Sequence, residues 1–159
     1  MPTIRPVTDA DLDAVRRVLV ETWHATYDAI MGAERVTAIT DDWHAVDRLR
    51  RQVDRPQAPF LLVEASDGAV IATGSAHREG EVAHVDRLYV RPDQHGRGVG
   101  TALLDALLRD AGAAARVELR VQQRNDGALA FYRRRGFSIV RPEDDDWVME
   151  LRPPDAPAG

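Results

Sequence analysis

The chain has 159 residues, which is enough for one domain with a hydrophobic core and short for two. It contains neither cysteine nor lysine, which excludes a disulfide framework, a thiol nucleophile, a cysteine-based metal site and lysine Schiff-base chemistry. The formal net charge of −5 argues against a nucleic-acid-binding surface, which is normally basic. The N-terminus has no apolar signal core and no segment approaches membrane-spanning length, so we expect a cytoplasmic protein with no nucleic-acid or membrane partner.

The first third of the chain predicts one strand and two helices. The strand spans residues 3–7, and Thr8 with Asp11 three residues later approximates a capping box for the first helix. Apolar residues at helical spacing continue this helix towards Gly32, which interrupts it. A second helix is expected from about residue 40, because three apolar side chains then share one face: Trp43, Val46 and Leu49.

The middle of the chain predicts three antiparallel strands. Residues 60–64 have the apolar run of a buried strand, and residues 66–68, Ser-Asp-Gly, favour a hairpin turn. The next strand spans residues 69–77, and a turn at residues 78–80 leads into a strand that continues to Val90.

The remainder predicts two helices, each followed by strands. A helix from about residue 99 connects the strand ending at Val90 to one at residues 117–121, an order that makes these two strands parallel neighbours. A further helix is expected from Asn125 through Arg135, and strands at residues 137–140 and 147–151 form a last hairpin. We therefore predict an α/β (α+β) fold: a single domain over residues 1–152, with a mixed central sheet of about seven strands flanked by about four helices. Residues 153–159, rich in proline and alanine, are expected to form a flexible tail.

Three glycines at alternate positions, Gly96, Gly98 and Gly100, stand just before the third predicted helix. A glycine loop that opens a helix presents unpaired N–H groups at the positive end of the helix dipole, which suits phosphate oxygens. A Cβ at these positions would hold a phosphate away from those N–H groups. The spacing does not fit the G-x-G-x-x-G pattern of dinucleotide-binding folds, and a chain without lysine has no Walker loop. The loop therefore predicts a pyrophosphate-binding site.

Two segments resemble motifs of the GCN5-related N-acetyltransferases. Residues 95–100, His-Gly-Arg-Gly-Val-Gly, are similar to the acetyl-CoA loop (Gln/Arg)-x-x-Gly-x-(Gly/Ala), with His95 where Gln or Arg is usual. Residues 125–137 are similar to N-x-x-A-x-x-F/L-Y-x-x-x-G-F, and the predicted element order resembles this fold over nearly the whole chain. The resemblance implies an N-acetyltransferase, of bacterial type, that uses acetyl-CoA as its acetyl donor.

The same resemblance implies roles for individual residues. It places the main chain of the strand ending at Val90 along the pantetheine arm, with one amide polarising the acetyl carbonyl. It places the glycine loop on the pyrophosphate and Asn125 near the pantetheine, and it makes Tyr132 the acid that protonates the leaving thiolate. The expected cofactor-binding set is Leu88, Tyr89, Val90, His95, Gly96, Arg97, Gly98, Val99, Gly100, Thr101 and Asn125.

Acetyl transfer to an amine also needs a base and a stabilised oxyanion. Without a cysteine, direct attack in a ternary complex is the simpler mechanism. Strand alternation puts four side chains on one face, namely His84, Asp86, Leu88 and Val90, and a histidine titrates near neutral pH, so we predict His84 with Asp86 as the base. Both residues are equally consistent with ordinary polar positions at a strand end, and Tyr132 with a half-buried helix aromatic.

The acceptor is expected to be a small molecule with a cationic primary amine. Acidic residues outnumber basic ones by 26 to 21, and two acidic runs, residues 41–42 and 143–146, border the segments on the acceptor side in this family. Trp23 and Tyr27, which match a W-x-x-x-Y pattern of many bacterial members, would form an aromatic wall for a cation, although core packing is the commoner fate of such a pair. We predict no metal, and a homodimer is compatible with the sequence. Two other functions stay open: a non-catalytic acyl-CoA-binding or regulatory module of this fold, and a nucleotide-binding protein that uses the glycine loop.

Overall fold

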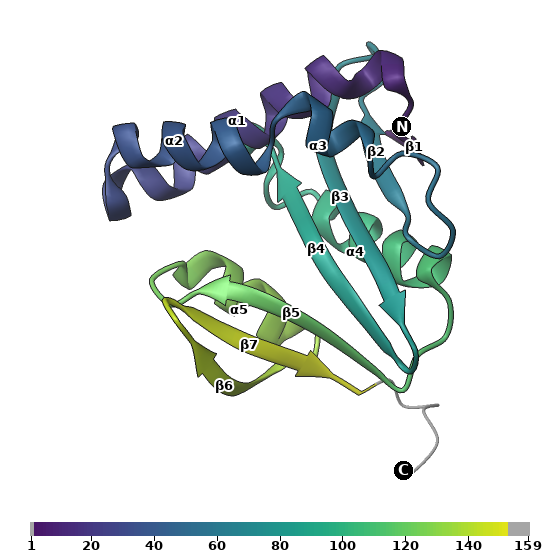
Figure 1. The fold of residues 1–159 in the computed structure, drawn as a ribbon, viewed down its shortest axis with the longest axis vertical. Helices are drawn as coiled ribbons and strands as arrows, with labels where there is room; N and C mark the ends of the chain where they lie inside the picture. The colour runs from purple at the N-terminus through teal and green to yellow at the C-terminus, as the bar shows by residue number, and fades with distance from the viewer. Residues whose placement is uncertain (1, 153–159) are drawn as a thin grey trace.

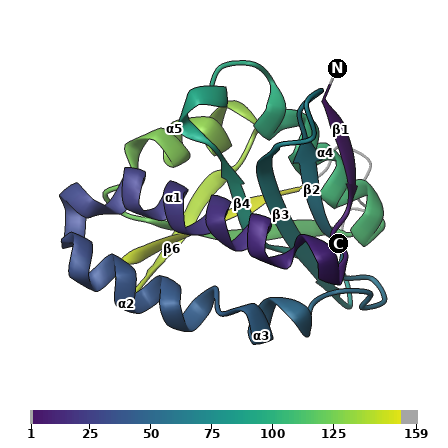
Figure 2. The same ribbon diagram turned by 90° about the horizontal axis from the view of Figure 1, so that it is seen from above.

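A computed structural model describes residues 2–152, in which one seven-stranded sheet lies between two layers of helices (Figures 1 and 2). The strands are β1 Thr3–Pro6, β2 Phe60–Glu64, β3 Val70–Glu79, β4 Val82–Val90, β5 Arg116–Gln122, β6 Ser138–Glu143 and β7 Asp146–Leu151. The helices are α1 Leu12–Met31, α2 Ala33–Trp43, α3 Val46–Arg50, α4 Val99–Ala111 and α5 Asp126–Arg134, with short 3₁₀ turns at Asp9–Asp11 and Pro92–Gln94. The predicted fold class and mixed sheet are confirmed, and the tail predicted for residues 153–159 lies outside the described residues.

The strand order is β1-β2-β3-β4-β5-β7-β6, and β4–β5 is the parallel pair that the strand–helix–strand order predicts. This pair is short, because its register covers only Val82, Ala83 and His84 against residues 116–118 of β5. Beyond His84 the two strands diverge, and Figure 1 shows the β1–β4 half and the β5–β7 half of the sheet spreading apart. The divergence leaves an opening in the middle of the sheet.

Apolar side chains fix the two helical layers to opposite faces of the sheet. On one face, α4 packs Leu103 and Leu107 against Leu61 and Val63 of β2. On the other face, α1 and α3 cover β2 through clusters that include Leu19, Leu49 and Leu62. Figure 2 shows α1, α2 and α3 on one side of the sheet and α4 and α5 on the other. Successive side chains of β2 therefore pack into two different hydrophobic cores, one on each face of the sheet.

The predicted second helix is wrong in its bounds. Gly32, with φ of +89°, ends α1, and α2 begins directly after it at Ala33 rather than near residue 40. Ala45 has an extended ψ of 140°, which breaks the helix, so α3 is separate and the described residues contain five helices instead of four. Trp43 and Leu49 consequently do not share a face: Trp43 is 52% exposed and Leu49 is fully buried.

The predicted helix start at Thr8 is confirmed in outline. The backbone N–H of Thr8 donates to the Asp11 carboxylate at 2.8 Å, which fixes the 3₁₀ turn that leads into α1. None of the helices between residues 2 and 152 has the length and apolar character that crossing a lipid bilayer requires.

Candidate active site

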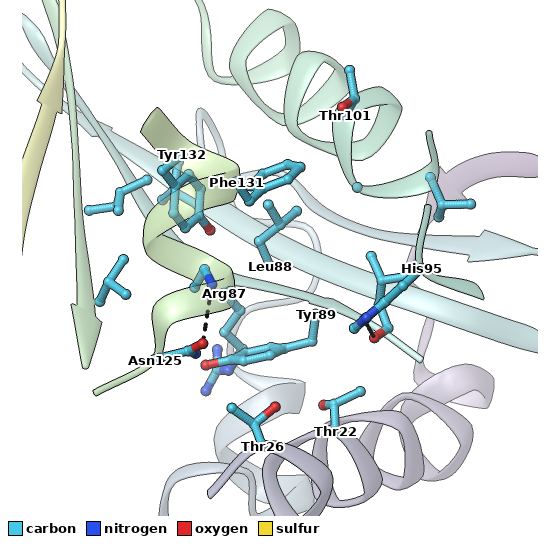
Figure 3. A pocket seen from close by; sticks show the side chains of 18 of the residues that line it. Thr22, Thr26, Arg87, Leu88, Tyr89, His95, Thr101, Asn125, Phe131 and Tyr132 are labelled. Atoms are coloured by element: carbon cyan, nitrogen blue, oxygen red, sulfur yellow. Dashed lines mark hydrogen bonds between the residues drawn. The ribbon is translucent and has the colours of Figure 1, made fainter. Parts of the chain in front are cut away.

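A cavity of about 650 Å³ occupies the opening between β4 and β5 (Figure 3). Its walls come from residues 85–90 of β4, residues 119–121 of β5 and one face of α5, and the glycine loop closes one end. Apart from Arg97, every residue of the predicted cofactor-binding set lines this cavity, and so do Tyr132 and Asp86. The structure therefore brings both resemblance-bearing segments, 95–100 and 125–137, to one site.

The glycine loop has a backbone conformation that favours glycine at two of its three glycine positions. Gly96 and Gly98 have φ values of +78° and +79°, a left-handed conformation that residues with side chains rarely adopt. A Cβ built on Gly98 would meet no atom within 4 Å, so packing within the protein does not explain the glycine there. His95 Nε2 donates to the Val90 carbonyl oxygen at 2.8 Å and ties the loop to the end of β4. The loop thus presents accessible N–H groups at the start of α4.

Gly100 has a different role from the other two glycines. A Cβ on Gly100 would lie 3.4 Å from ring atoms of Phe131 and 3.6 Å from Val90 Cγ2. The third glycine therefore allows α4 to approach α5 closely. The sequence pattern alone does not separate this packing role from a phosphate-binding role.

A β-bulge in β4 changes which of its residues share a face. The register of β3 with β4 shifts between Ser75 and Ala76 and leaves Asp86 as the extra residue. A bulge of this kind re-aims the side chains beside it. The expectation from strand alternation, that His84, Asp86, Leu88 and Val90 lie on one face, is therefore wrong.

Beyond the bulge, alternate residues of β4 face opposite helical layers. Leu88 and Val90 pack against the α4 core, whereas Tyr89 packs against the clusters beneath α1. Figure 3 shows the same division, with Leu88 beside Phe131 and Tyr89 on the side of Thr26. The sheet at this point separates two environments that meet at its opening.

Asp86 has a different partner from the one that strand alternation predicts. Its Oδ2 lies 2.7 Å from Nδ1 of His77 on the neighbouring strand β3. The His84 ring stacks on the His77 ring, with centroids 4.8 Å apart and planes 13° apart. His84 lines neither this cavity nor the one described next, whereas Asp86 lines both. The candidate base is therefore Asp86 supported by His77, with His84 behind it.

A second cavity of about 460 Å³ lies on the α1–α3 side of the sheet. It shares Asp86, Arg87 and Tyr89 with the first cavity, and its other lining residues come from α1, α2, α3, the segment that follows α3, β2 and β3. Three residues of β4 thus border both cavities.

A model of the acetyltransferase (GNAT) family matches residues 15–137. The chain belongs to this family. A spermidine N(1)-acetyltransferase of Thermoplasma acidophilum is 24% identical over 155 residues, which cover 94% of this chain and 96% of that protein. A peptidyl-lysine N-acetyltransferase of Salmonella typhimurium is 32% identical over 97 residues, which cover 57% of this chain and 59% of that protein.

The fold also matches a solved acetyltransferase. The crystal structure of the PaiA N-acetyltransferase from T. acidophilum in complex with coenzyme A has a TM-score of 0.89 and 24% identity to this chain, with coverage of 96% and 99% of the two chains. Together with the family match, this confirms the predicted GNAT fold, the N-acetyltransferase class and acetyl-CoA as the donor of the family.

Tyr132 of this acetyltransferase is buried in the wall of the first cavity. Its ring packs edge-on against Phe131 and Phe137, with centroids 5.1 and 5.5 Å away, as the half-buried aromatic alternative expects. Burial raises the pKa of Tyr132 well above its ordinary value, so the phenol stays protonated at neutral pH. Figure 3 shows its hydroxyl pointing towards the space beside Leu88. Tyr132 is thus a buried aromatic whose protonated hydroxyl lines the first cavity.

Asn125 connects α5 to α1. Its side-chain oxygen accepts from the Ala128 N–H at 3.1 Å, which confirms it as the helix cap, and its Nδ2 donates to the Tyr27 hydroxyl at 3.2 Å. Burial raises the pKa of Tyr27 above its ordinary value. Trp23 lies 4.6 Å from Tyr27 between ring centroids, but Tyr27 lines the first cavity and Trp23 the second. Both rings are buried, so the predicted aromatic wall is split between the two cavities.

Sequence reasoning missed several residues of the two cavities. Arg134 and Arg135 line the first cavity, although the Arg-Arg-Arg run at residues 133–135 is most simply explained by the helix dipole. Arg87, His44 and Ser75 line the second cavity, and no motif marks them.

One group of three metal-capable side chains occurs within residues 2–152. The candidate ligand atoms of His77, Glu79 and His84 lie within 4.8 Å of one another at the end of the β3–β4 hairpin. Glu79 is 74% exposed there, and His77 is already bonded to Asp86. The prediction that this acetyltransferase needs no metal stays a prediction.

Proposed function

We propose that this acetyltransferase transfers the acetyl group of acetyl-CoA to the primary amine of a small molecule, by direct attack in a ternary complex. The observation that carries the proposal is that both cavities border the same three residues, Asp86, Arg87 and Tyr89. A donor in the first cavity and an acceptor in the second would meet at this point without leaving their sites. The second cavity has the size of small-molecule sites in general.

The donor is held mainly by backbone in this proposal. The N–H groups of the glycine loop bind the pyrophosphate, and Arg134 and Arg135 add positive charge beside it. The main chain of Leu88, Tyr89 and Val90 lies along the pantetheine, with one amide stabilising the oxyanion that forms on the acetyl carbonyl.

The chemical step transfers two protons. The amine nitrogen attacks the thioester carbon, and its proton passes to Asp86, which His77 and the stacked His84 orient and connect to solvent. The C–S bond then breaks, and the coenzyme A thiolate takes a proton from the Tyr132 hydroxyl. Solvent restores both groups, so acetyl-CoA and the amine become coenzyme A and an amide.

The names of two relatives support amine chemistry, because spermidine and peptidyl-lysine both offer primary amines. We place the small molecule ahead of the peptide since the second cavity, of about 460 Å³, is in the size range of small-molecule sites. A cytoplasmic location and a homodimer stay part of the proposal.

A panel of amines, scored by acetyl-CoA-dependent thiol release, tests the proposal. Release that saturates with one small primary amine, and that shows no acetyl-enzyme in its absence, is the expected result. If acetyl-CoA raises the melting temperature but no amine releases thiol, the chain is a non-catalytic acyl-CoA-binding module. If ATP raises the melting temperature and acetyl-CoA does not, the glycine loop serves a nucleotide.

A further inference from the structure

The second cavity is lined by more positive than negative charge. Arg48, Arg55 and Arg87 line it, and Asp86 is the one carboxylate among the lining residues. Asp86 is itself bonded to His77 at 2.7 Å. Arg48 forms an exposed ion pair with Asp42 at 3.1 Å, which leaves Arg55 and Arg87 without a comparable partner among residues 2–152.

The guanidinium of Arg87 donates hydrogen bonds to neutral groups. Its Nε, Nη1 and Nη2 atoms donate to His44 Nδ1 at 3.3 Å, Gln52 Oε1 at 2.6 Å and the Trp43 carbonyl oxygen at 3.0 Å. No carboxylate of the described chain lies within ion-pair distance of the guanidinium. Burial lowers the pKa of Arg87 below its ordinary value, and the attraction of the neighbouring Asp86 offsets this only in part. A guanidinium held rigidly in this way is a ready partner for a carboxylate.

Among the buried side chains that line the same cavity, those of His44 and Ser75 each have a polar atom without a hydrogen-bond partner. Nε2 of His44 and Oγ of Ser75 have no hydrogen-bond partner within the described residues, although His44 and Ser75 are only 2% and 3% exposed. Buried polar atoms are normally paired, so each of these two atoms has the capacity for one further hydrogen bond. Because a guanidinium can only donate, His44 Nδ1 accepts from Arg87, and the neutral ring carries its proton on Nε2. His44 therefore offers a donor, and the Ser75 hydroxyl can offer another.

We propose that the acceptor is a small amine that also carries a carboxylate, of the amino-acid type, and that the second cavity binds this carboxylate through Arg87, His44 and Ser75. The amine of the same molecule then lies towards Asp86, where the two cavities meet. This inference rests on the proposed acetyltransferase reaction and names its substrate class.

The proposal replaces the cationic acceptor that the acidic runs predict. Asp41 pairs with Arg16 at 3.1 Å, Asp42 with Arg48 at 3.1 Å, and Glu143 with Arg120 at 2.8 Å. These carboxylates are neutralised by neighbours, and none of the residues of the two acidic runs lines either cavity. The side chains of Trp23 and Trp43 line the second cavity and would contact the side chain of an amino acid rather than enclose a cation.

Matched pairs of acceptors test this directly. Each pair consists of an L-amino acid and the amine that its decarboxylation would give, with spermidine as a further acceptor, and thiol release gives kcat/KM for each. We expect the carboxylate-bearing member of the preferred pair to be used at least tenfold better. In Arg87→Gln this ratio should fall towards one through a higher KM, in Arg87→Lys it should fall less, and in Arg50→Gln, an exposed arginine paired with Asp47 outside the cavity, it should be unchanged.

Several outcomes overturn the proposal. Spermidine or decarboxylated amines used as well as the amino acids would do so, as would an unchanged ratio in Arg87→Gln. Where Arg87→Gln does not fold, melting of the wild-type protein with coenzyme A present decides: amino acids should raise its melting temperature and the decarboxylated amines should not. This binding measurement also separates the two proposals, because a carboxylate-selective shift without thiol release contradicts the reaction and keeps the site.

Discussion

The two cavities on either side of β4 are built in different ways. The first cavity, which we propose for the donor, is closed at one end by the glycine loop, residues 96–101, and much of its proposed binding comes from the main chain. The second cavity, which we propose for the acceptor, takes its side chains from many separate segments, among them Trp23 of α1, His44 after α2 and Ser75 of β3. A site made by backbone needs a local conformation, and local conformation leaves a pattern in sequence. A site made by scattered side chains leaves none.

The β-bulge at Asp86 determines which side chains of β4 face each cavity. By inserting Asp86 it turns Arg87 and Tyr89 towards the α1–α3 layer while Leu88 and Val90 keep the α4 core. Donor chemistry and acceptor recognition thus use neighbouring residues of one strand. Variants in each cavity should therefore separate cleanly into donor, chemical and acceptor effects.

The largest expected effect belongs to Tyr132, at the chemical step. Tyr132→Phe removes only the hydroxyl and should lower kcat by about a hundredfold to ten-thousandfold, the usual contribution of a general acid. Because burial raises the pKa of Tyr132, the wild-type rate should not fall from its ionisation as the pH rises through the neutral range. Thiol release at saturating amine measures kcat, and acetyl-CoA binding should persist. A kcat within twofold of the wild type would remove Tyr132 from the chemistry.

A smaller effect, on acetyl-CoA affinity, is expected for Gly98→Ala in the glycine loop of the first cavity. Both Gly98 and Gly68, in the β2–β3 turn, have positive φ and open space around a Cβ, so both alanine variants carry similar backbone strain, about 1–2 kcal/mol. Only at Gly98 would the methyl group approach a bound phosphate. We expect Gly98→Ala to weaken acetyl-CoA binding about tenfold or more, as titration calorimetry would measure.

Gly68→Ala is the matched control for this loop. It should lose the same stability and keep wild-type affinity for acetyl-CoA. Equal affinity of the two variants would show that the phosphates bind somewhere other than the glycine loop.

The same contrast explains what the sequence could predict. The seven strands, the parallel β4–β5 pair, the Asn125 cap and the loop at residues 95–100 follow from local periodicity, chain order and two motifs, and they are confirmed. The break at Ala45 was missed because alanine gives no local signal for an extended backbone. The partnership of Asp86 with His77 depends on a bulge and on a neighbouring strand, and neither is visible in a period-two pattern. Arg87 stands in that strand as an ordinary charged residue until the fold surrounds it with neutral acceptors.

The smallest expected effect is on the pH dependence of the free energy of unfolding, and it comes from His44, which is buried beside the second cavity. Desolvation, with the nearby positive charge of Arg87, lowers the pKa of His44 to about 3, below its ordinary value of 6.5. The folded state therefore binds fewer protons than the unfolded state between these values, so stability is complete above about pH 6.5 and falls as the pH falls below it. The slope from this one group approaches 1.4 kcal/mol per pH unit, the free energy of one pKa unit.

Urea unfolding between pH 7.5 and 5 isolates this contribution, because a residue that cannot titrate there provides the reference. His44→Gln should shift the whole stability curve and lose about 2 kcal/mol of its pH dependence over that interval, whatever the size of the shift. The partly exposed His24, bonded to Asp28 on α1, supplies the comparison: His24→Gln removes a histidine from outside the second cavity, so a change of slope found only in His44→Gln belongs to the buried ring. If His44→Gln keeps the full slope, the imidazole is not held neutral. Its proton would then not be confined to Nε2, and the carboxylate site would rest on Arg87 and Ser75.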